Sequence, residues 1–276
     1  LLRGRYFFVR KAMRTYRLVL ALVLLALVLT GAYTAFMYVY TEHKFTLPKL
    51  LTEPSDYTVG TPAKQILFLH QVNTPRRAKK KEDKYSGFEL DLMAVPEKND
   101  KKIYVAHDEK QLKKHIKPDD IFSALRAPAE KYWWLDLKTD LTQTDIDYIL
   151  HTAKAYHIPT DHLYWETQPG PTARLIKKNK LNLLLQLPEG FENDEQSAAK
   201  RNAINEAALK EWQEYKPAAV SASFGKYTYL KAYFPHLPKA IYYSATIRPS
   251  LKKTFMKRHM AEDHSVQIFM LDEYTF

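Results

Sequence analysis

Three carboxylates lie in two short apolar stretches of this 276-residue chain, at a spacing that suits metal binding. Glu89 and Asp91 are two residues apart in "GFELDL", and Asp136 stands two residues before Lys138 in "YWWLDLK". Residues i and i+2 of a strand point to the same face, so each pair lies on one side of its strand. Oxygen ligands in a chain without cysteine suit a hard divalent cation, Mg²⁺ first and Ca²⁺ as the alternative.

Two histidines and a fourth acid end neighbouring apolar stretches. His70 follows "ILFL", His107 closes "KIYVAH", and Glu166 lies near the end of "HLYWET". Two imidazoles beside a cation could act as base and acid, and Lys138 could hold a phosphate oxygen, a combination that suits phosphodiester cleavage. Each residue also has an ordinary interpretation: a structural histidine, a solvated strand edge, or an Asp136–Lys138 salt bridge.

Apolar stretches alternate with charged, helix-like stretches from residue 63 onward, which indicates strands separated by helices. The expected strands cover residues 66–72, 87–95, 102–107, 132–138, 162–167, 181–187, 218–223, 239–246 and 265–271. Helices are expected over 142–157, 171–179 and 194–215, among others. The pattern predicts a (β/α)8 TIM-type barrel with one extra strand or hairpin, whose functional residues meet where the strands end. An open doubly wound sheet is the alternative, but no glycine-rich turn follows the first strand.

Four motifs carry a resemblance to a known family. In order, "HQVN", "FELDL", "VAHD" and "LDLKT" resemble the motifs of the phospholipase C-like phosphodiesterase superfamily, most clearly over residues 66–139. That group includes glycerophosphodiester phosphodiesterases, venom-type phospholipase D (sphingomyelinase D) enzymes and menorin-like proteins. The resemblance implies a TIM barrel with a Mg²⁺-type ion held by Glu89, Asp91 and Asp136. It also implies an acid/base or nucleophilic pair, His70 and His107, and a phosphate contact from Lys138.

Other positions bear on the substrate and on whether the site is active. Asn73 and Glu166 are expected to contact the substrate, and Asn73 also to orient His70 or its loop. Gln71 stands where glycerophosphodiesterases have arginine, and Ser244 where the family often has tryptophan. These departures leave a second interpretation open, in which a catalytically degenerate barrel serves as a binding or structural subunit of a membrane protein assembly.

The N-terminus carries a candidate membrane anchor. Residues 18–40 form 23 uncharged positions, and six arginines and lysines precede them without an acid. This length spans a bilayer, and the positive-inside rule places the N-terminus in the cytoplasm and the remaining domain on the extracytoplasmic side. A cleaved signal peptide is the alternative, although the apolar stretch is long and a good cleavage site is missing. The chain therefore divides into a basic segment (1–17), a transmembrane helix (18–40), a stalk (41–62) and a barrel domain (63–276).

Charge alone indicates no nucleic-acid partner. The formal net charge is +11, but more than half of it comes from the segment before the anchor, where it reports topology. The basic stretch "RRAKKKEDK" (76–84) is either a solvated loop or a surface that attracts anionic headgroups. The expected partner is a membrane lipid or a lipid-derived phosphodiester.

Overall fold

The structure is a computed structural model that describes residues 2–45, 65–97, 100–188, 198–243 and 251–271. Nine strands are present in these residues: β1 (Ile66–Leu69), β2 (Gly87–Glu97), β3 (Asp100–Val105), β4 (Tyr132–Leu137), β5 (Leu163–Thr167), β6 (Asn182–Gln186), β7 (Ala219–Ser223), β8 (Lys239–Tyr243) and β9 (Val266–Leu271). The α-helices are α1 (Leu2–Phe45), α2 (Pro75–Lys81), α3 (Glu109–Leu112), α4 (Pro118–Phe122), α5 (Gln143–Ala155), α6 (Pro171–Lys178), α7 (Ala198–Tyr215), α8 (Tyr227–Tyr233) and α9 (Leu251–Glu262). Three short 3₁₀ turns, Pro128–Glu130, Thr160–His162 and Phe224–Lys226, precede β4, β5 and α8.

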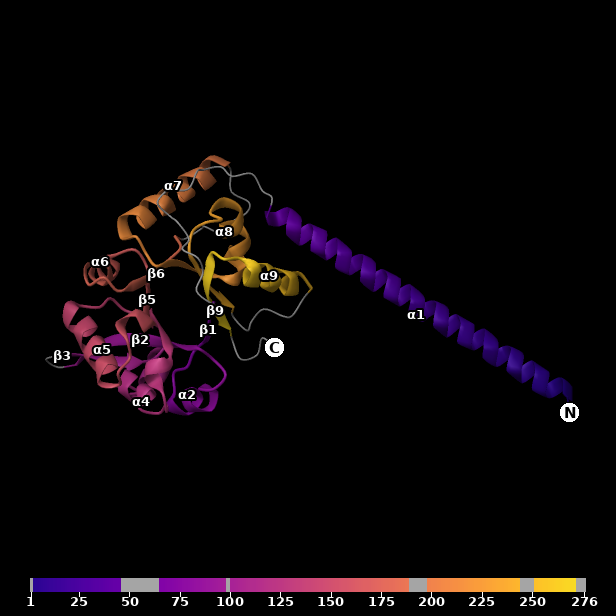
Figure 1. The fold of residues 1–276 in the computed structure, drawn as a ribbon, viewed down its shortest axis with the longest axis horizontal. Helices are drawn as coiled ribbons and strands as arrows, with labels where there is room; N and C mark the ends of the chain where they lie inside the picture. Colours follow the sequence, from indigo (N-terminus) through magenta and orange to yellow (C-terminus); the bar gives the residue numbers. More distant parts are fainter. Residues whose placement is uncertain (1, 46–64, 98–99, 189–197, 244–250, 272–276) are drawn as a thin grey trace.

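Eight of the described strands close into a parallel barrel. Neighbouring strands pair in the order β1-β9-β8-β7-β6-β5-β4-β2, and β1 also pairs with β2 to complete the ring. Helices other than α1 surround this ring, and α1 projects away from it (Figure 1). The predicted TIM-type barrel is confirmed, and each of the nine expected strands is found. The helices expected over 142–157, 171–179 and 194–215 correspond to α5, α6 and α7, although residues 194–197 lie outside the described part.

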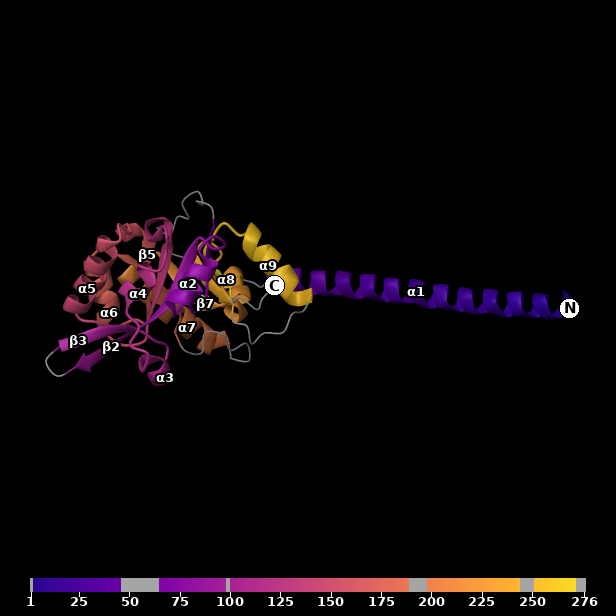
Figure 2. The ribbon, with the colours of Figure 1, turned by 90° about the horizontal axis from the view of Figure 1, so that it is seen from below.

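The extra strand β3 is the additional strand or hairpin that the sequence predicts, and it decides the direction from which His107 arrives. β3 runs antiparallel to β2, pairing from Glu97↔Asp100 to Leu92↔Val105. Because β2 extends beyond the last residue that pairs with β4, the β2–β3 hairpin projects past the barrel mouth (Figure 2). β3 then returns to the level of Asp91, whose carbonyl oxygen accepts a hydrogen bond from the Ala106 N–H at 2.9 Å. His107 therefore reaches the mouth from the opposite direction.

Alternation along the strands separates the barrel interior from the helix layer. In β4, Trp134 belongs to the cluster inside the barrel, whereas Trp133 packs outward, 4.5 Å from the ring of Phe122 on α4. Both tryptophans are fully buried, and a buried aromatic side chain of this kind contributes roughly 1.5–3 kcal/mol to folding. Inside the barrel, the Phe68 ring lies edge-on to Trp134 with 6.0 Å between ring centroids.

This interior cluster forms a floor beneath the mouth. Residues two positions further along a strand point the same way, so seven residues of the floor each have a successor nearer the mouth. The pairs are Phe68 and His70, Trp134 and Asp136, Tyr164 and Glu166, Leu184 and Gln186, Ala219 and Ser221, Ala240 and Tyr242, and Ile268 and Met270. The floor thus supports a ring of mostly polar side chains.

Gly87 makes room for the floor. A Cβ atom at this position would lie 2.7 Å from a carbon of the Phe68 ring, which is closer than van der Waals contact allows. Glycine therefore permits β2 to pass the ring two residues before Glu89.

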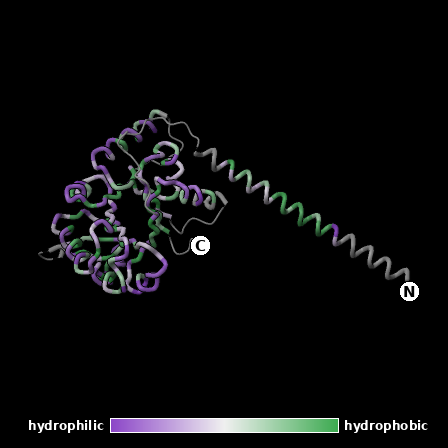
Figure 3. Tube along the Cα trace, viewed as in Figure 1, coloured by the Kyte–Doolittle hydropathy of each residue, from purple (hydrophilic) through white to green (hydrophobic). Residues whose placement is uncertain are grey.

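Helix α1 contains the predicted membrane segment. Tyr16–Tyr40 covers 25 residues with a mean hydropathy of 2.4, and most of this span is coloured hydrophobic in Figure 3. Its side chains are not buried in the protein. The helix is long and apolar enough to cross a membrane, and a signal sequence would have the same properties. The end of α1 lies beside α8 and α9, where the Tyr38 ring meets Phe255 edge-on at 5.6 Å (Figures 1 and 2). Of the expected stalk, 41–45 continue α1 and 46–62 lie outside the described residues, as does Ser244.

Candidate active site

The barrel mouth contains a cavity of about 260 Å³. Six of the eight predicted site residues line it: His70, Glu89, His107, Asp136, Lys138 and Glu166. The other two, Asp91 and Asn73, are buried directly behind this lining and are joined by a hydrogen bond from Asn73 Nδ2 to Asp91 Oδ2 at 2.5 Å. The structure therefore brings all eight predicted residues to one end of the barrel.

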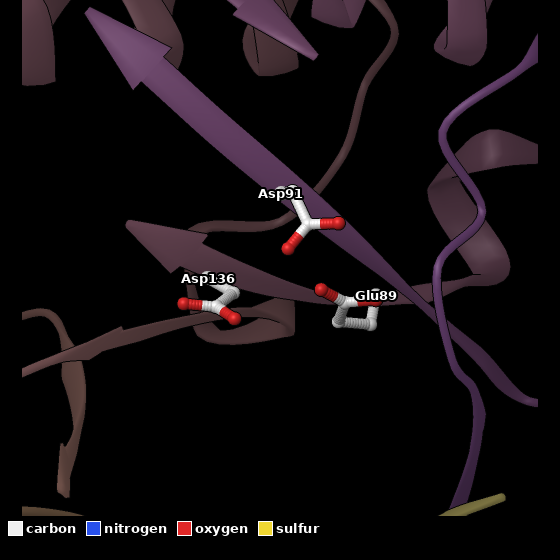
Figure 4. A group of neighbouring side chains, drawn as sticks. All are labelled: Glu89, Asp91 and Asp136. Carbon is white, nitrogen blue, oxygen red and sulfur yellow. The ribbon is translucent and has the colours of Figure 1, made fainter. Parts of the chain in front are cut away.

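Three carboxylates converge at this mouth. Glu89, Asp91 and Asp136 each present an oxygen within 4.8 Å of the other two (Figure 4). The register explains this convergence, because Asp91 of β2 pairs directly with Asp136 of β4. Glu89 and Asp91 are each only 1% exposed. The Oε1 atom of Glu89 accepts no hydrogen bond from any described residue.

Burial makes this arrangement electrostatically costly. It raises the pKa of Glu89 well above its usual range, and the nearby charges of Asp91 and Asp136 raise it further. Burial also raises the pKa of Asp136, against the opposing effect of the Lys138 ammonium. Both raised pKa values mean that a buried negative charge is unfavourable here. A positive charge added beside these carboxylates would therefore be stabilising.

Lys138 supplies one such charge. Its Nζ lies 2.8 Å from Asp91 Oδ1 and 2.5 Å from Asp136 Oδ2. Burial opposes the ammonium, but the two carboxylates outweigh burial and raise the pKa of Lys138 above its ordinary value. Lys138 is therefore a fixed cation between two strands.

A set of amides fixes the acids of β2. Asn73 Oδ1 accepts a hydrogen bond from the Asp91 backbone N–H at 3.1 Å, in addition to the contact from its Nδ2. The Gln71 backbone N–H donates to Glu89 Oε2. Gln71 adopts a φ of 53°, in the left-handed region of the backbone map, which costs a non-glycine residue free energy. This strained conformation directs the Gln71 N–H toward the Glu89 carboxylate. The contact that Asn73 makes with Asp91 is a positioning role that the sequence did not predict.

Both histidines line the cavity from different elements. His70 is half-buried directly after β1, and its backbone N–H donates to the Leu271 carbonyl at 2.9 Å. His107 is exposed at the rim, and its backbone N–H donates to Gln111 Oε1 at 3.3 Å. The same Gln111 oxygen accepts from Asn73 Nδ2 at 3.2 Å, which connects the loop of His107 to the carboxylates.

Glu166 is a buried acid in the lining of the cavity. Trp134 Nε1 donates to its Oε2 at 2.7 Å, and Ser221 Oγ donates to its Oε1. Burial, assisted by the charge of Asp136, raises the pKa of Glu166 to about 8. Both carboxylate oxygens are thus bound by the barrel itself.

Sequence reasoning missed four residues that also line the cavity: Gln71, Gln186, Tyr242 and Met270. Gln71 was singled out only as a departure from a family pattern. The other three follow a floor residue by two positions, and Gln186 ends the otherwise apolar run of β6. Applying the same i, i+2 spacing to every strand would have identified them.

The donor set fits a hard divalent cation. Three carboxylates within reach of one another, a buried Glu89 oxygen without a donor and raised pKa values at two of the acids all favour added positive charge. Lys138 holds one oxygen each of Asp91 and Asp136, so a cation would share those carboxylates with the ammonium.

Comparisons with known proteins leave the family open. No protein-family model and no curated protein sequence matches this chain. Among solved structures, a glycerophosphodiester phosphodiesterase from Parabacteroides distasonis is similar with 11% identity and a TM-score of 0.47, over 77% of this chain and 94% of that one.

Two other similar structures have different activities. A dihydropteroate synthase from Clostridium difficile has 9% identity and a TM-score of 0.43, over 78% of this chain and 93% of its own. An archaeal fructose 1,6-bisphosphate aldolase has 9% identity and a TM-score of 0.38, over 76% and 86%. Because these TM-scores lie below 0.5, the barrel assignment depends on the strand pairing described above and the function on the site itself.

Proposed function

We propose that this chain is a membrane-anchored, metal-dependent phosphodiesterase that acts on a glycerophosphodiester or a phospholipid headgroup. The observation that supports it most is the meeting of Glu89, Asp91 and Asp136 within 4.8 Å of one another, beside a cavity that two histidines also line. The order of the motifs along the chain, which resembles that of the phospholipase C-like phosphodiesterases, agrees with this proposal.

A divalent cation held by Glu89, Asp91 and Asp136 would polarise the phosphoryl group and offset the negative charge of the transition state. Lys138 would contact a nonbridging phosphate oxygen, because its ammonium is held at the cavity wall by two carboxylates. The buried floor below would exclude water from the inner side of the phosphate.

His70 and His107 would transfer the protons. One imidazole accepts the proton of the attacking hydroxyl as its oxygen bonds to phosphorus. The other donates a proton to the ester oxygen that leaves as its bond to phosphorus breaks. With water as the nucleophile the products are a phosphomonoester and an alcohol; with a hydroxyl of the substrate, a cyclic phosphate forms instead.

A panel of phosphodiesters, assayed with and without Mg²⁺, tests the proposal on the full chain in detergent. We expect Mg²⁺-dependent release of alcohol by the wild type, and a fall of about 10²–10⁴-fold in kcat for His70→Ala and for His107→Ala. The exposed His151 on α5 provides the matched control, and His151→Ala should keep full activity. Equal activity in all four proteins would contradict the assignment of the two imidazoles.

A second candidate is a barrel that binds a membrane protein partner without catalysis. It is favoured by one observation: Lys138 and Asn73 already occupy three oxygens of Asp91 and Asp136. In that case the lysine takes the place of the cation. An inactive panel, together with a melting temperature that Mg²⁺ does not change, would select this candidate.

We propose that α1 anchors the barrel from a cytoplasmic N-terminus, so that the site lies on the extracytoplasmic side. Support comes from the 25-residue, largely apolar segment Tyr16–Tyr40 and from the arginines and lysines that precede its uncharged part. The tether would keep the barrel close to lipid headgroups.

A further inference from the structure

A second cavity lies beside the active-site cavity and has a different chemical character. It measures about 200 Å³, and apart from Val105 its lining is polar: Gln71, Asn73, Thr74, Arg77, Gln111 and Lys114. We call it the arginine pocket. Its lining carries two cations and no carboxylate, whereas the lining of the active-site cavity carries three acids. The two adjacent cavities thus differ in the charged side chains that line them. Such a pair suits a ligand whose two parts differ in charge.

Arg77 lies in the basic stretch 76–84. From the sequence, this stretch is either a solvated loop or a surface that attracts anionic groups. In the structure the stretch begins with helix α2 rather than a loop, and Thr74 caps this helix by accepting the Arg77 N–H at 3.3 Å. Arg77 is half-buried, while Arg76, Lys79 and Lys80 are exposed. The helix therefore separates one arginine from the solvated cations and turns it toward the pocket.

The arginine pocket is physically connected to the catalytic residues. Arg77 Nη2 donates to the carbonyl oxygen of His70 at 3.1 Å. Gln71, the next residue, lines both cavities. Gln111 links the pocket to the His107 backbone. A phosphodiester bound at the carboxylates can thus extend one of its arms past Gln71 into the arginine pocket.

We propose that the arginine pocket binds an anionic group, a carboxylate or a phosphate, on one arm of the phosphodiester substrate. Arginine offers two parallel donors to such a group, and Lys114 adds a second positive charge to the lining. Lys114 is exposed and forms no ion pair with a described residue, so its charge is available to a ligand. The side-chain amide of Gln111 and the hydroxyl of Thr74 supply further donors. This inference rests on the proposed phosphodiesterase function and narrows its substrates to those with an anionic headgroup.

Two matched substrate pairs test it on the full chain in detergent. Glycerophosphoserine differs from glycerophosphoethanolamine by a carboxylate, and glycerophosphoinositol 4-phosphate differs from glycerophosphoinositol by a phosphate. We expect kcat/KM of the wild type to favour the more anionic member of at least one pair by roughly tenfold to a hundredfold. The pair with the larger ratio identifies the anion. The preference should decrease as salt rises, because screening weakens partly exposed charge pairs.

Substitutions assign the preference to residues. Lys114→Gln should reduce it severalfold, and Lys113→Gln, an exposed neighbour outside the pocket, should leave it intact. Arg77→Gln should abolish the preference, with some loss on all substrates because Arg77 also holds the His70 carbonyl. Equal kcat/KM within both pairs, or a preference that survives both pocket substitutions, would overturn the inference and leave the phosphodiesterase proposal standing.

If no substrate is cleaved, the phosphodiesterase proposal fails and equilibrium binding decides the pocket. Calorimetry of glycerophosphoserine and glycerophosphoethanolamine, and of the two inositol compounds, would be compared between wild type and Lys114→Gln. Tighter binding of the more anionic member that is lost in Lys114→Gln supports the pocket. Binding that ignores the extra anion refutes it.

Discussion

Replacing Glu89 by glutamine changes the charge at the barrel mouth while nearly preserving the size of the side chain. Glu89 is only 1% exposed, and its Oε2 accepts the Gln71 N–H. The carbonyl oxygen of glutamine can accept the same hydrogen bond, so the main consequence is electrostatic. Without a divalent cation, we expect Glu89→Gln to stabilise the fold, whereas most substitutions of a buried polar residue destabilise it.

The size of the effect follows from the distances among the carboxylates. Two unit charges 4.8 Å apart repel by roughly 3.5 kcal/mol at an effective dielectric constant of about 20. Lys138 offsets part of this repulsion, and the raised pKa of Glu89 means that part of its charge is already neutralised. A gain of about 1–3 kcal/mol remains, which corresponds to about 2–12 °C in Tm for a domain of this size.

Mg²⁺ should reverse the comparison. A ligand that binds only the folded chain adds about 2.7 kcal/mol at a concentration one hundred times its Kd. The wild type should gain this stability, and Glu89→Gln should gain much less because one of its three charged ligands is missing.

Thermal unfolding of the full chain in detergent, in EDTA and in millimolar Mg²⁺, measures both effects. Glu130→Gln makes the same chemical change at an exposed position that precedes β4, at the end of the barrel opposite the mouth, and should leave both melting temperatures unchanged. A lower Tm for Glu89→Gln in EDTA would refute the repulsion argument. An equal response of the wild type and Glu89→Gln to Mg²⁺ would refute the role of Glu89 as a ligand.

Three further predictions concern the floor, the pH response and the anchor. Gly87→Ala should destabilise the fold by about 1–3 kcal/mol because the added Cβ would lie 2.7 Å from the Phe68 ring. Gly225→Ala, whose Cβ has no neighbour closer than 3.9 Å, should be nearly neutral. Equal Tm values for the two variants would contradict the packing argument. Since burial raises the pKa of Glu166 from 4.5 to about 8, the folded chain retains a proton that the unfolded chain releases, and stability should fall as pH rises through this window. In EDTA, Glu166→Gln should show a flatter dependence of Tm on pH between 5 and 8, and an unchanged slope would show that Glu166 does not titrate there. The apolar segment Tyr16–Tyr40 predicts that the full chain remains in membranes after alkaline carbonate extraction, and its release would argue against a spanning helix.

Much of the candidate site could be predicted because strand residues alternate between two faces. That rule places Glu89 with Asp91 and Asp136 with Lys138 on the inner face of the barrel, as the structure has them. It also reveals Gln186 and Tyr242, once each is recognised as the successor of a floor residue. The direction of β3 was not predictable in this way, because alternation along a strand is the same for a parallel and an antiparallel strand.

Local composition therefore determined the order of the elements, the apolar N-terminal helix and the residue types available at the mouth. These features depend on residues close together in the sequence, so the spacing of apolar and polar residues is enough to predict them. Tertiary structure alone decided that Asp91 pairs with Asp136, that Lys138 lies between them, and that Arg77 faces a pocket beside His70. Such contacts depend on strand register and barrel closure, in which residues distant in the chain meet, and burial there shifts the pKa values of Glu89 and Glu166.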